Sequence, residues 1–313
     1  MGRWLRMGRR RLPWGVQACL ACLACLAGLA PAAGSAAAVR VVDDLGTDVV
    51  LERPAGRIVC LYGGLTEIVC ALGLDGALVG CTRGETYPPS VRAKPRVGTH
   101  LRPNLELILG LAPDLVLQGG GRAEAAVTVA RLRARGIPAA VFNPADFEGL
   151  FSTIRRIGVL TGRPAAARRL VADMERRLQA VRALVPRGAP RPKVFFEVNE
   201  TSLIAAGARS IVDAVIEQAG GRNVVRVPKR LVRCDLEFLL AAAPDVYVIQ
   251  EGVMNPAPSD PRRRPNFALL PAVRAGRILR VDEALFSRPG PRSVQAVELL
   301  HAFLYPRAAE VAP

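Results

Sequence analysis

Two loops carry side chains whose types and spacing could bind a ligand. Tyr87, His100 and Arg102 fall within one proline-rich loop that directly follows a predicted strand. Arg288 and Arg292 flank a Pro-Gly-Pro turn that follows another predicted strand. Open α/β sheets bind ligands at the carboxyl ends of their strands, so both loops are candidate parts of a binding site. The arginine pair suits an anionic group, although two arginines capping the loop would explain the pattern equally well.

Glu106 and Glu237 occupy matching positions in a repeated segment. The sequence NLELILGLAPD (104–114) recurs 131 positions later as DLEFLLAAAPD (235–245), with six of eleven positions identical. Each copy begins with a residue that can cap a helix and stops at Ala-Pro-Asp before an apolar run typical of a buried strand. The helix dipole favours a carboxylate in the first turn by roughly 0.3–1 kcal/mol. The recurrence of the glutamate in both copies also allows a paired role for Glu106 and Glu237 at the protein surface.

Motifs of enzymes and of bare-metal sites do not accompany these residues. The sequence has no G-x-S-x-G nucleophile elbow and no H-E-x-x-H zinc motif. Its two histidines, His100 and His301, are too few for a zinc or manganese site built from several His and carboxylate ligands. We therefore expect a binding protein rather than an enzyme, with no catalytic residues, no intrinsic cofactor and no metal ion held by the protein alone.

The repeat and the alternation of strand and helix predict an α/β fold of two lobes. The pattern predicts that residues 39–145 form the N-terminal α/β lobe and that residues 187–313 form the C-terminal one. Each lobe is expected to have a central, mostly parallel sheet. Residues 146–186 consist almost entirely of helix formers and predict a long, rigid backbone helix that joins the lobes. A ligand would then bind in the cleft between the lobes.

Residues 1–38 are typical of a secretory signal peptide. Five arginines and no acidic residue precede the apolar run 14–30, and alanine-rich sequence leads to an expected cleavage site near Ala38. A retained membrane anchor is the alternative, but this run of about 17 residues is shorter than the ~20 that a spanning helix needs. We therefore expect an exported protein in the periplasm.

The charge of the chain favours anionic partners. Without the five arginines of the predicted signal, 38 basic residues face 27 acidic ones. Such a surplus attracts anions in general, but the arginines are scattered along predicted helices and match no nucleic-acid-binding motif. Because the protein is also expected to be exported, nucleic acid is excluded as a partner.

Four cysteines remain after the predicted signal: Cys60, Cys70, Cys81 and Cys234. In an oxidising compartment they could form up to two disulfides in any of three pairings. None belongs to a C-x-x-C motif, which argues against a zinc knuckle or a thioredoxin-like site. Buried free thiols are expected for at least two of them.

The order of these segments resembles the periplasmic binding proteins of ABC importers for iron-siderophores, haem and cobalamin. The resemblance covers the whole mature chain and rests on Thr66-Glu67, the YPP loop, the two L-E…A-P-D units, GG-x-N and the final RPGPR. It implies a monomer that captures an iron or cobalt chelate and delivers it to a membrane permease with a cytoplasmic ATPase. The alternatives are a secreted binding or sensory module without an importer and a secreted enzyme.

The resemblance also assigns roles to individual residues. In this family, glutamates at the lobe tips dock onto arginines of the permease, and their positions match Glu106 and Glu237. Six arginines would meet an anionic chelate: Arg102, Arg122, Arg230, Arg233, Arg288 and Arg292. Three aromatic side chains could wall the cleft: Tyr62, Tyr87 and Phe286.

The identity of the chelate stays open at this point. If the ligand is haem, Tyr87 could ligate its iron and His100 could approach the other face of the ring. A packing role for the tyrosine and a local hydrogen bond for the histidine are the alternatives. Ferric siderophore, cobalamin and haem all fit, with ferric siderophores the broadest class.

Overall fold

The computed structural model describes residues 1–2, 38–119, 122–188 and 190–306. The described residues from 38 onward belong to one compact unit. The predicted signal peptide therefore lies outside the described residues, apart from its ends. None of the helices in the described ranges combines the length and the apolar character that crossing a bilayer requires.

The N-terminal lobe is built on a parallel four-stranded sheet with the order β4-β3-β5-β6. Its strands are β3 (Ile58–Cys60), β4 (Leu78–Cys81), β5 (Leu115–Gln118) and β6 (Ala139–Val141). The helices between them are α2 (Gly63–Ala71), α3 (Leu105–Gly110) and α4 (Arg122–Arg133), with the 3₁₀ turn η1 (Pro89–Ala93). An antiparallel hairpin of β1 (Val39–Val42) and β2 (Asp48–Leu51) precedes the sheet. All residues of β3 and β5 are buried, as expected for strands covered on both faces.

The C-terminal lobe has a mixed sheet with the order β10-β8-β7-β11-β12, and β9 pairs with β7. Its strands are β7 (Lys193–Asn199), β8 (Ile204–Ala206), β9 (Arg222–Asn223), β10 (Leu231–Arg233), β11 (Val246–Glu251) and β12 (Ile278–Asp282). Its helices are α7 (Ile211–Gln218), α8 (Leu236–Ala242), α9 (Pro271–Arg274), α10 (Glu283–Phe286) and α11 (Ser293–Leu304), with 3₁₀ turns η2 (Pro261–Arg263) and η3 (Phe267–Leu269). Strands β8 and β10 run antiparallel to their neighbours. The predicted two-lobe α/β fold is thus confirmed.

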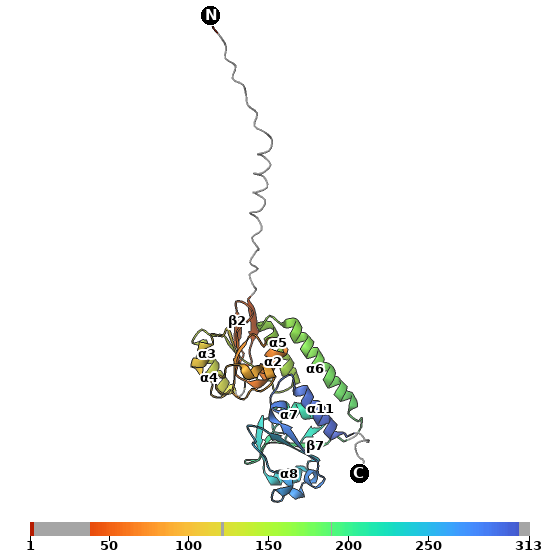
Figure 1. Ribbon diagram of the computed structural model, residues 1–313. Coiled ribbons are helices and arrows are strands. Elements are labelled where there is room, and N and C mark those ends of the chain that lie inside the picture. The colour runs from red at the N-terminus through yellow and green to blue at the C-terminus, as the bar shows by residue number, and fades with distance from the viewer. Residues whose placement is uncertain (3–37, 120–121, 189, 307–313) are drawn as a thin grey trace. The chain divides into compact units, whose positions relative to one another are not determined.

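Two helices connect the sheets: α5 (Phe147–Leu160) and α6 (Pro164–Leu184) (Figure 1). Asp146 caps α5 by accepting a hydrogen bond from the backbone N of Gly149 at 2.7 Å. Helix α5 ends at Leu160, and Gly162 follows in the left-handed region (φ 67°). Pro164 starts α6, because its fixed φ suits the first helical turn. Arg177 of α6 donates two hydrogen bonds to Glu298 of α11, at 2.8 and 2.7 Å, and so links the two helices.

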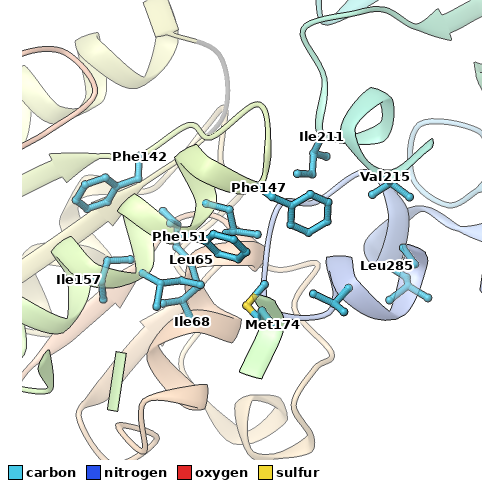
Figure 2. Close-up of a cluster of buried hydrophobic side chains, with 14 of the residues drawn as sticks. Leu65, Ile68, Phe142, Phe147, Phe151, Ile157, Met174, Ile211, Val215 and Leu285 are labelled. Carbon is cyan, nitrogen blue, oxygen red and sulfur yellow. The ribbon is translucent and has the colours of Figure 1, made fainter. Parts of the chain in front are cut away.

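One buried cluster contains side chains from both lobes and from the connecting helices (Figure 2). Leu65 of α2 and Phe151 of α5 belong to the same cluster as Met174 of α6, Val215 of α7 and Leu285 of α10. Burial of side chains of this size contributes about 1.5–3 kcal/mol each. The lobes therefore share a core, and this core holds the loops of the candidate site in fixed positions.

The repeated segment makes the same contacts in both lobes. Asn104 and Asp235 cap α3 and α8 by accepting hydrogen bonds from the backbone N atoms three residues later. The closing aspartates, Asp114 and Asp245, accept hydrogen bonds from the start of the neighbouring strand, at Arg57 N (2.9 Å) and Lys193 N (2.7 Å). The repeat is therefore a helix-to-strand unit that its last aspartate ties to the adjacent strand.

The four cysteines of the described residues are free thiols: Cys60, Cys70, Cys81 and Cys234. Cys60 and Cys81 are buried side by side on β3 and β4. Burial raises the pKa of both thiols, and that of Cys70 to about 12. Because the thiolate is the reactive form, these are packing residues rather than nucleophiles or metal ligands.

Candidate functional site

A cavity of about 720 Å³ lies between loops of the two sheets. The N-terminal lobe lines it with residues after β3 and β4 and before α3, including Tyr62, Arg83 and His100. Residues from the C-terminal lobe, such as Arg230 and Arg288, line the opposite side. Its volume falls within the roughly 300–1,000 Å³ of small-molecule sites. The cavity is therefore the candidate binding site, at the carboxyl ends of strands where the sequence placed it.

Tyr62 is positioned by the turn from β3 into α2. Its backbone is extended (φ −160°, ψ 133°) at the cap of the helix. Its ring lies directly on Gly119 after β5, where an added Cβ would come within 2.7 Å of the tyrosine Cβ. The hydroxyl accepts a hydrogen bond from Arg230 Nη2 at 3.4 Å, across the cavity. The glycine thus allows the ring to stand at the cavity wall with its hydroxyl next to a cation.

His100 stands beside Tyr62, with the two ring centroids 5.8 Å apart and the rings at 80°. Gln118 holds the histidine backbone by donating a hydrogen bond from Nε2 to its carbonyl at 3.1 Å. Burial lowers the pKa of His100 below its ordinary 6.5, and Arg230 and Arg288 lower it further. The imidazole is therefore neutral at pH 7, the form that can accept a hydrogen bond or ligate a metal.

Three carboxylates and three arginines line the cavity: Glu85, Glu124 and Glu283, and Arg83, Arg230 and Arg288. Glu85 accepts a hydrogen bond from Thr82 Oγ1 at 2.5 Å, and burial raises the pKa of its carboxyl. Glu283 lies 3.9 Å from Arg288. Within the described residues, Arg83 and Arg230 form no ion pair, so their charges are available to an anionic group on a ligand.

Apolar side chains complete the wall. Ile211 and Val212 come from the start of α7, and Leu231 from β10. Val253 and Met254 come from the loop after β11 and are 80% and 40% exposed, although both are large apolar side chains. Exposed apolar side chains grouped at a cavity mark a ligand-binding surface.

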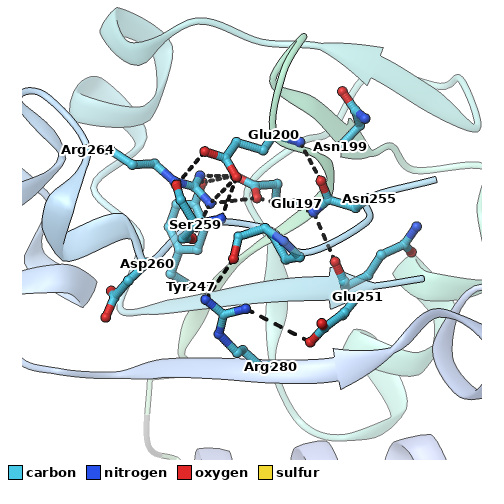
Figure 3. Close-up of polar contacts among 12 residues, drawn as sticks. Glu197, Asn199, Glu200, Tyr247, Glu251, Asn255, Ser259, Asp260, Arg264 and Arg280 are labelled. Carbon is cyan, nitrogen blue, oxygen red and sulfur yellow. Dashed lines mark hydrogen bonds and ion pairs between the residues drawn. The ribbon is translucent and has the colours of Figure 1, made fainter. Parts of the chain in front are cut away.

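The loop that carries Val253 and Met254 is held to the sheet by a buried polar network (Figure 3). Glu197 of β7 has no exposed surface and accepts hydrogen bonds from Tyr247 Oη at 2.5 Å and from Arg264 Nη2 at 3.1 Å. Asn255 donates to the carbonyl of Gln250 at 2.9 Å. Burial raises the pKa of Tyr247, and the neighbouring Glu197 raises it further. The network fixes where the two apolar side chains meet the cavity.

Four of the predicted ligand contacts line the cavity: Tyr62, His100, Arg230 and Arg288. Arg102 and Arg233 are exposed and lie outside its wall. The backbone of Arg122 starts α4, but its side chain falls outside the description.

Phe286 does not wall the cleft, which corrects the prediction for this residue. Its side chain is 1% exposed and stacks on Phe196 in the core, with the ring centroids 6.1 Å apart. The residue is on α10, whose buried face turns it inward. A phenylalanine next to a binding loop can serve either the core or the site, and the sequence does not distinguish the two.

Tyr87 and Arg292 meet each other outside the cavity. The guanidinium of Arg292 lies 4.0 Å from the centroid of the Tyr87 ring. The same guanidinium donates two hydrogen bonds to Glu67 of α2, at 2.9 and 2.6 Å. Burial raises the pKa of Glu67, and the Arg292 charge opposes that rise. The ion pair of Arg292 with Glu67 joins the start of α11 to α2. The Tyr87 side chain above it is 45% exposed.

Glu106 and Glu237 are exposed in the first turns of α3 and α8. Neither forms an ion pair among the described residues, so both carboxylates can meet a partner. Each is followed by an exposed apolar residue, Leu107 (51%) or Phe238 (37%). A docking role for the two glutamates stays a prediction.

Several cavity residues were missed by sequence reasoning. Arg83 and Glu85 lie in the same loop as Tyr87, and their position directly after a strand could have identified them. Val253 and Met254 lie in the loop 251–265, which otherwise consists mostly of polar residues and proline, and the adjacent apolar pair was the available signal. Glu124 and Glu283 carried no such signal, because the fold alone turns them toward the cavity.

Comparisons with known proteins agree on one family. The family described as "Periplasmic binding protein" matches residues 58–285. An ABC transporter substrate-binding lipoprotein, YvrC, of Bacillus subtilis is 29% identical over 273 residues, 86% of each chain. A cobalamin-binding protein of Halobacterium salinarum is 32% identical over 66% of this chain and 57% of its own.

A solved structure supports the same conclusion. The periplasmic haem-binding protein RhuT of Roseiflexus sp. RS-1 superimposes with a TM-score of 0.70 at 31% identity, over 80% of this chain and 98% of that one. The region matched by the family, residues 58–285, contains the four-stranded and six-stranded sheets and all the residues that line the cavity except Ser287 and Arg288. The chain therefore belongs to the periplasmic binding protein family.

Proposed function

We propose that the cavity captures a tetrapyrrole metal chelate in the periplasm. The protein is the extracytoplasmic substrate-binding component of an ABC importer, and it would deliver the chelate as a monomer to a permease served by a cytoplasmic ATPase. The metal would arrive within the ligand, so the protein needs no cofactor of its own. The observation that carries the proposal is the cavity wall, which joins two aromatic rings and an apolar surface to unpaired arginines.

The chemistry of a tetrapyrrole matches this wall. Its flat, largely apolar ring can pack against Tyr62 and His100 on one side and against Val253 and Met254 on the other. Its polar or anionic periphery can meet Arg83 and Arg230, which have no carboxylate partner in the described chain. The relatives are named for binding cobalamin and haem, and both of these ligands contain a tetrapyrrole ring. Their names therefore support a tetrapyrrole as the ligand class.

Haem is the case in which a protein side chain could ligate the metal. The Tyr62 hydroxyl and the neutral His100 ring both border the cavity, and phenol oxygen and imidazole nitrogen are both ligands that haem iron accepts. Tyr87, for which the sequence left iron ligation and a packing role open, packs against Arg292. Tyr62 and His100 are therefore the better candidates if the ligand is haem.

The test is to titrate the purified mature protein separately with haem, cyanocobalamin and ferrichrome. Binding is followed by visible absorption and by isothermal titration calorimetry. We expect micromolar or tighter binding of at least one tetrapyrrole and none of the siderophore. A haem Soret shift lost in Tyr62→Phe or His100→Ala, but kept in Tyr87→Phe, would identify a ligating side chain. Binding of ferrichrome alone, or of none of the three, would refute the tetrapyrrole assignment.

A further inference from the structure

A second cavity of about 460 Å³ adjoins the first. We call it the side chamber and define it by Asn143, Arg209, Ser210, Lys229, Arg230 and Pro289. Ser210, Ile211 and Arg230 line both cavities, so the two spaces share a wall. A ligand in the first cavity would therefore lie next to the second.

The side chamber is lined by three cations and no carboxylate: Arg209, Lys229 and Arg230. In the described part of the chain, none of the three forms an ion pair, and Arg230 donates only to the Tyr62 hydroxyl. Asp146 follows directly after a chamber residue, but its carboxylate accepts a hydrogen bond from Gly149 N and caps α5. The positive charge of the chamber is thus not neutralised by the protein itself.

The backbone holds these like charges together. The segment 207–209 is hydrogen-bonded to the segment 227–230 through Gly207 N to Arg230 O (3.0 Å) and Arg209 N to Lys229 O (3.2 Å). Gly207 makes this approach possible, because an added Cβ would lie 2.3 Å from the Lys229 carbonyl oxygen. The three residues therefore lie at neighbouring positions of one cavity wall, where an anion in the chamber would be attracted by more than one positive charge.

We propose that the side chamber binds an anionic arm, a phosphodiester or a carboxylate, of the chelate held in the main cavity. Arg230 stands at the shared wall, where it can contact the arm while its guanidinium remains near Tyr62. The chamber then selects chelates with an anionic substituent over those that have the same ring without it. This inference rests on the proposed function, since it takes the main cavity to hold a tetrapyrrole.

The experiment compares two tetrapyrroles that differ in the arm. For a corrinoid the pair is cyanocobalamin, with its phosphodiester-linked nucleotide, and dicyanocobinamide, which lacks it. For haem the pair is haem and its dimethyl ester. The pair is chosen by which ring the native protein binds, and affinities are measured by calorimetry for the native protein and for Arg209→Gln/Lys229→Gln. These two residues line the side chamber and not the main cavity.

We expect the double variant to bind the anionic ligand about 10-fold more weakly, as for the loss of a charge-assisted contact, and the neutral ligand within about 2-fold. The control is Arg168→Gln/Arg169→Gln, which removes the same charge from exposed positions of α6 that line neither cavity. Its affinities should match those of the native protein. Equal loss for both ligands, or no loss for either, would overturn the side-chamber assignment and leave the proposed function intact.

Inorganic phosphate distinguishes an arm of the ligand from a separate anion. If the chamber holds the arm, phosphate competes with the anionic ligand and leaves the neutral one unaffected. Phosphate that tightens binding of the neutral ligand would assign the chamber to a free anion and overturn the inference. If the native protein binds no tetrapyrrole of either pair, the proposed function itself fails, which is a different result from any of these.

Discussion

At the scale of single residues, Arg264 shows how a buried charge can position a distant binding surface. Its side chain is 7% exposed and forms an ion pair with Glu197, which has no exposed surface. It also donates to the carbonyl of Ser259 at 2.8 Å. The arginine thereby joins the loop after β11 to strand β7 (Figure 3). The same loop carries Val253 and Met254, which line the cavity.

Removing this arginine should be costly. We expect Arg264→Gln to lower the free energy of unfolding by about 3–5 kcal/mol, because Glu197 would remain buried without a counter-charge. Urea denaturation followed by circular dichroism measures the change. The matched control is Arg262→Gln in the same loop, whose side chain is 66% exposed and whose partner Asp260 is partly exposed. A native-like unfolding curve for both variants would contradict a structural role for the buried pair.

At the scale of elements, α2 and the turn before α11 approach so closely that only glycine fits between them. A Cβ added to Gly64 would lie 2.0 Å from the carbonyl oxygen of Pro289. Next to this contact, Arg292 donates to Glu67 of the same helix. The contact fixes Gly63 and Arg288, which both line the cavity, relative to each other.

Gly64→Ala should therefore disturb both stability and binding. We expect a loss of about 1–3 kcal/mol from overpacking, together with weaker binding of whichever ligand the native protein takes up. Gly110→Ala is the control, because nothing lies within 4 Å of a Cβ at the end of α3. That variant should gain a few tenths to about 1 kcal/mol from the stiffer unfolded chain. Thermal unfolding measures the change in stability, and calorimetry measures the change in ligand affinity. Equal stability and equal affinity of the two variants would refute the close-contact argument.

At the scale of the whole molecule, each lobe presents an exposed glutamate at the start of a short helix. Glu106 and Glu237 occur at the same place in the repeated unit, and neither lines the cavity. The cap and the closing aspartate of each unit are used within the lobe, whereas the glutamates are not. This division favours an external partner for the two carboxylates, which we propose is the permease.

Reversal of both charges tests permease docking. Glu106→Arg/Glu237→Arg should reduce uptake by cells with the cognate importer about 10-fold or more, because two arginines would face cations of the permease. Affinity of the purified protein for its ligand should not change. Glu148→Arg serves as the control, since it reverses another exposed glutamate in a first helical turn. Normal uptake by the double variant would exclude these residues as docking contacts.

The sequence by itself determined the fold class and the loops that form the cavity. Its local signals are short-range: Asn104 and Asp235 cap helices, Pro113 and Pro244 end them, and apolar runs become strands. Because the carboxyl ends of parallel strands meet at one edge of a sheet, the order of elements was enough to place the site. His100 and Arg288 could be named in this way, whereas Tyr62 and Arg230 were named from the resemblance to the family.

Only the tertiary structure decided which side chains of those loops face the ligand. Phe286 turned into the core and Arg292 paired with Glu67, a residue 225 positions away in the chain. Such pairs depend on how two lobes pack, and no periodic pattern in the sequence encodes the distance between them. The side chamber is the same kind of feature, since it exists only where Asn143 of one lobe meets Arg209 and Lys229 of the other. Long-range packing, which local propensity does not report, fixed the charge that a ligand would encounter there.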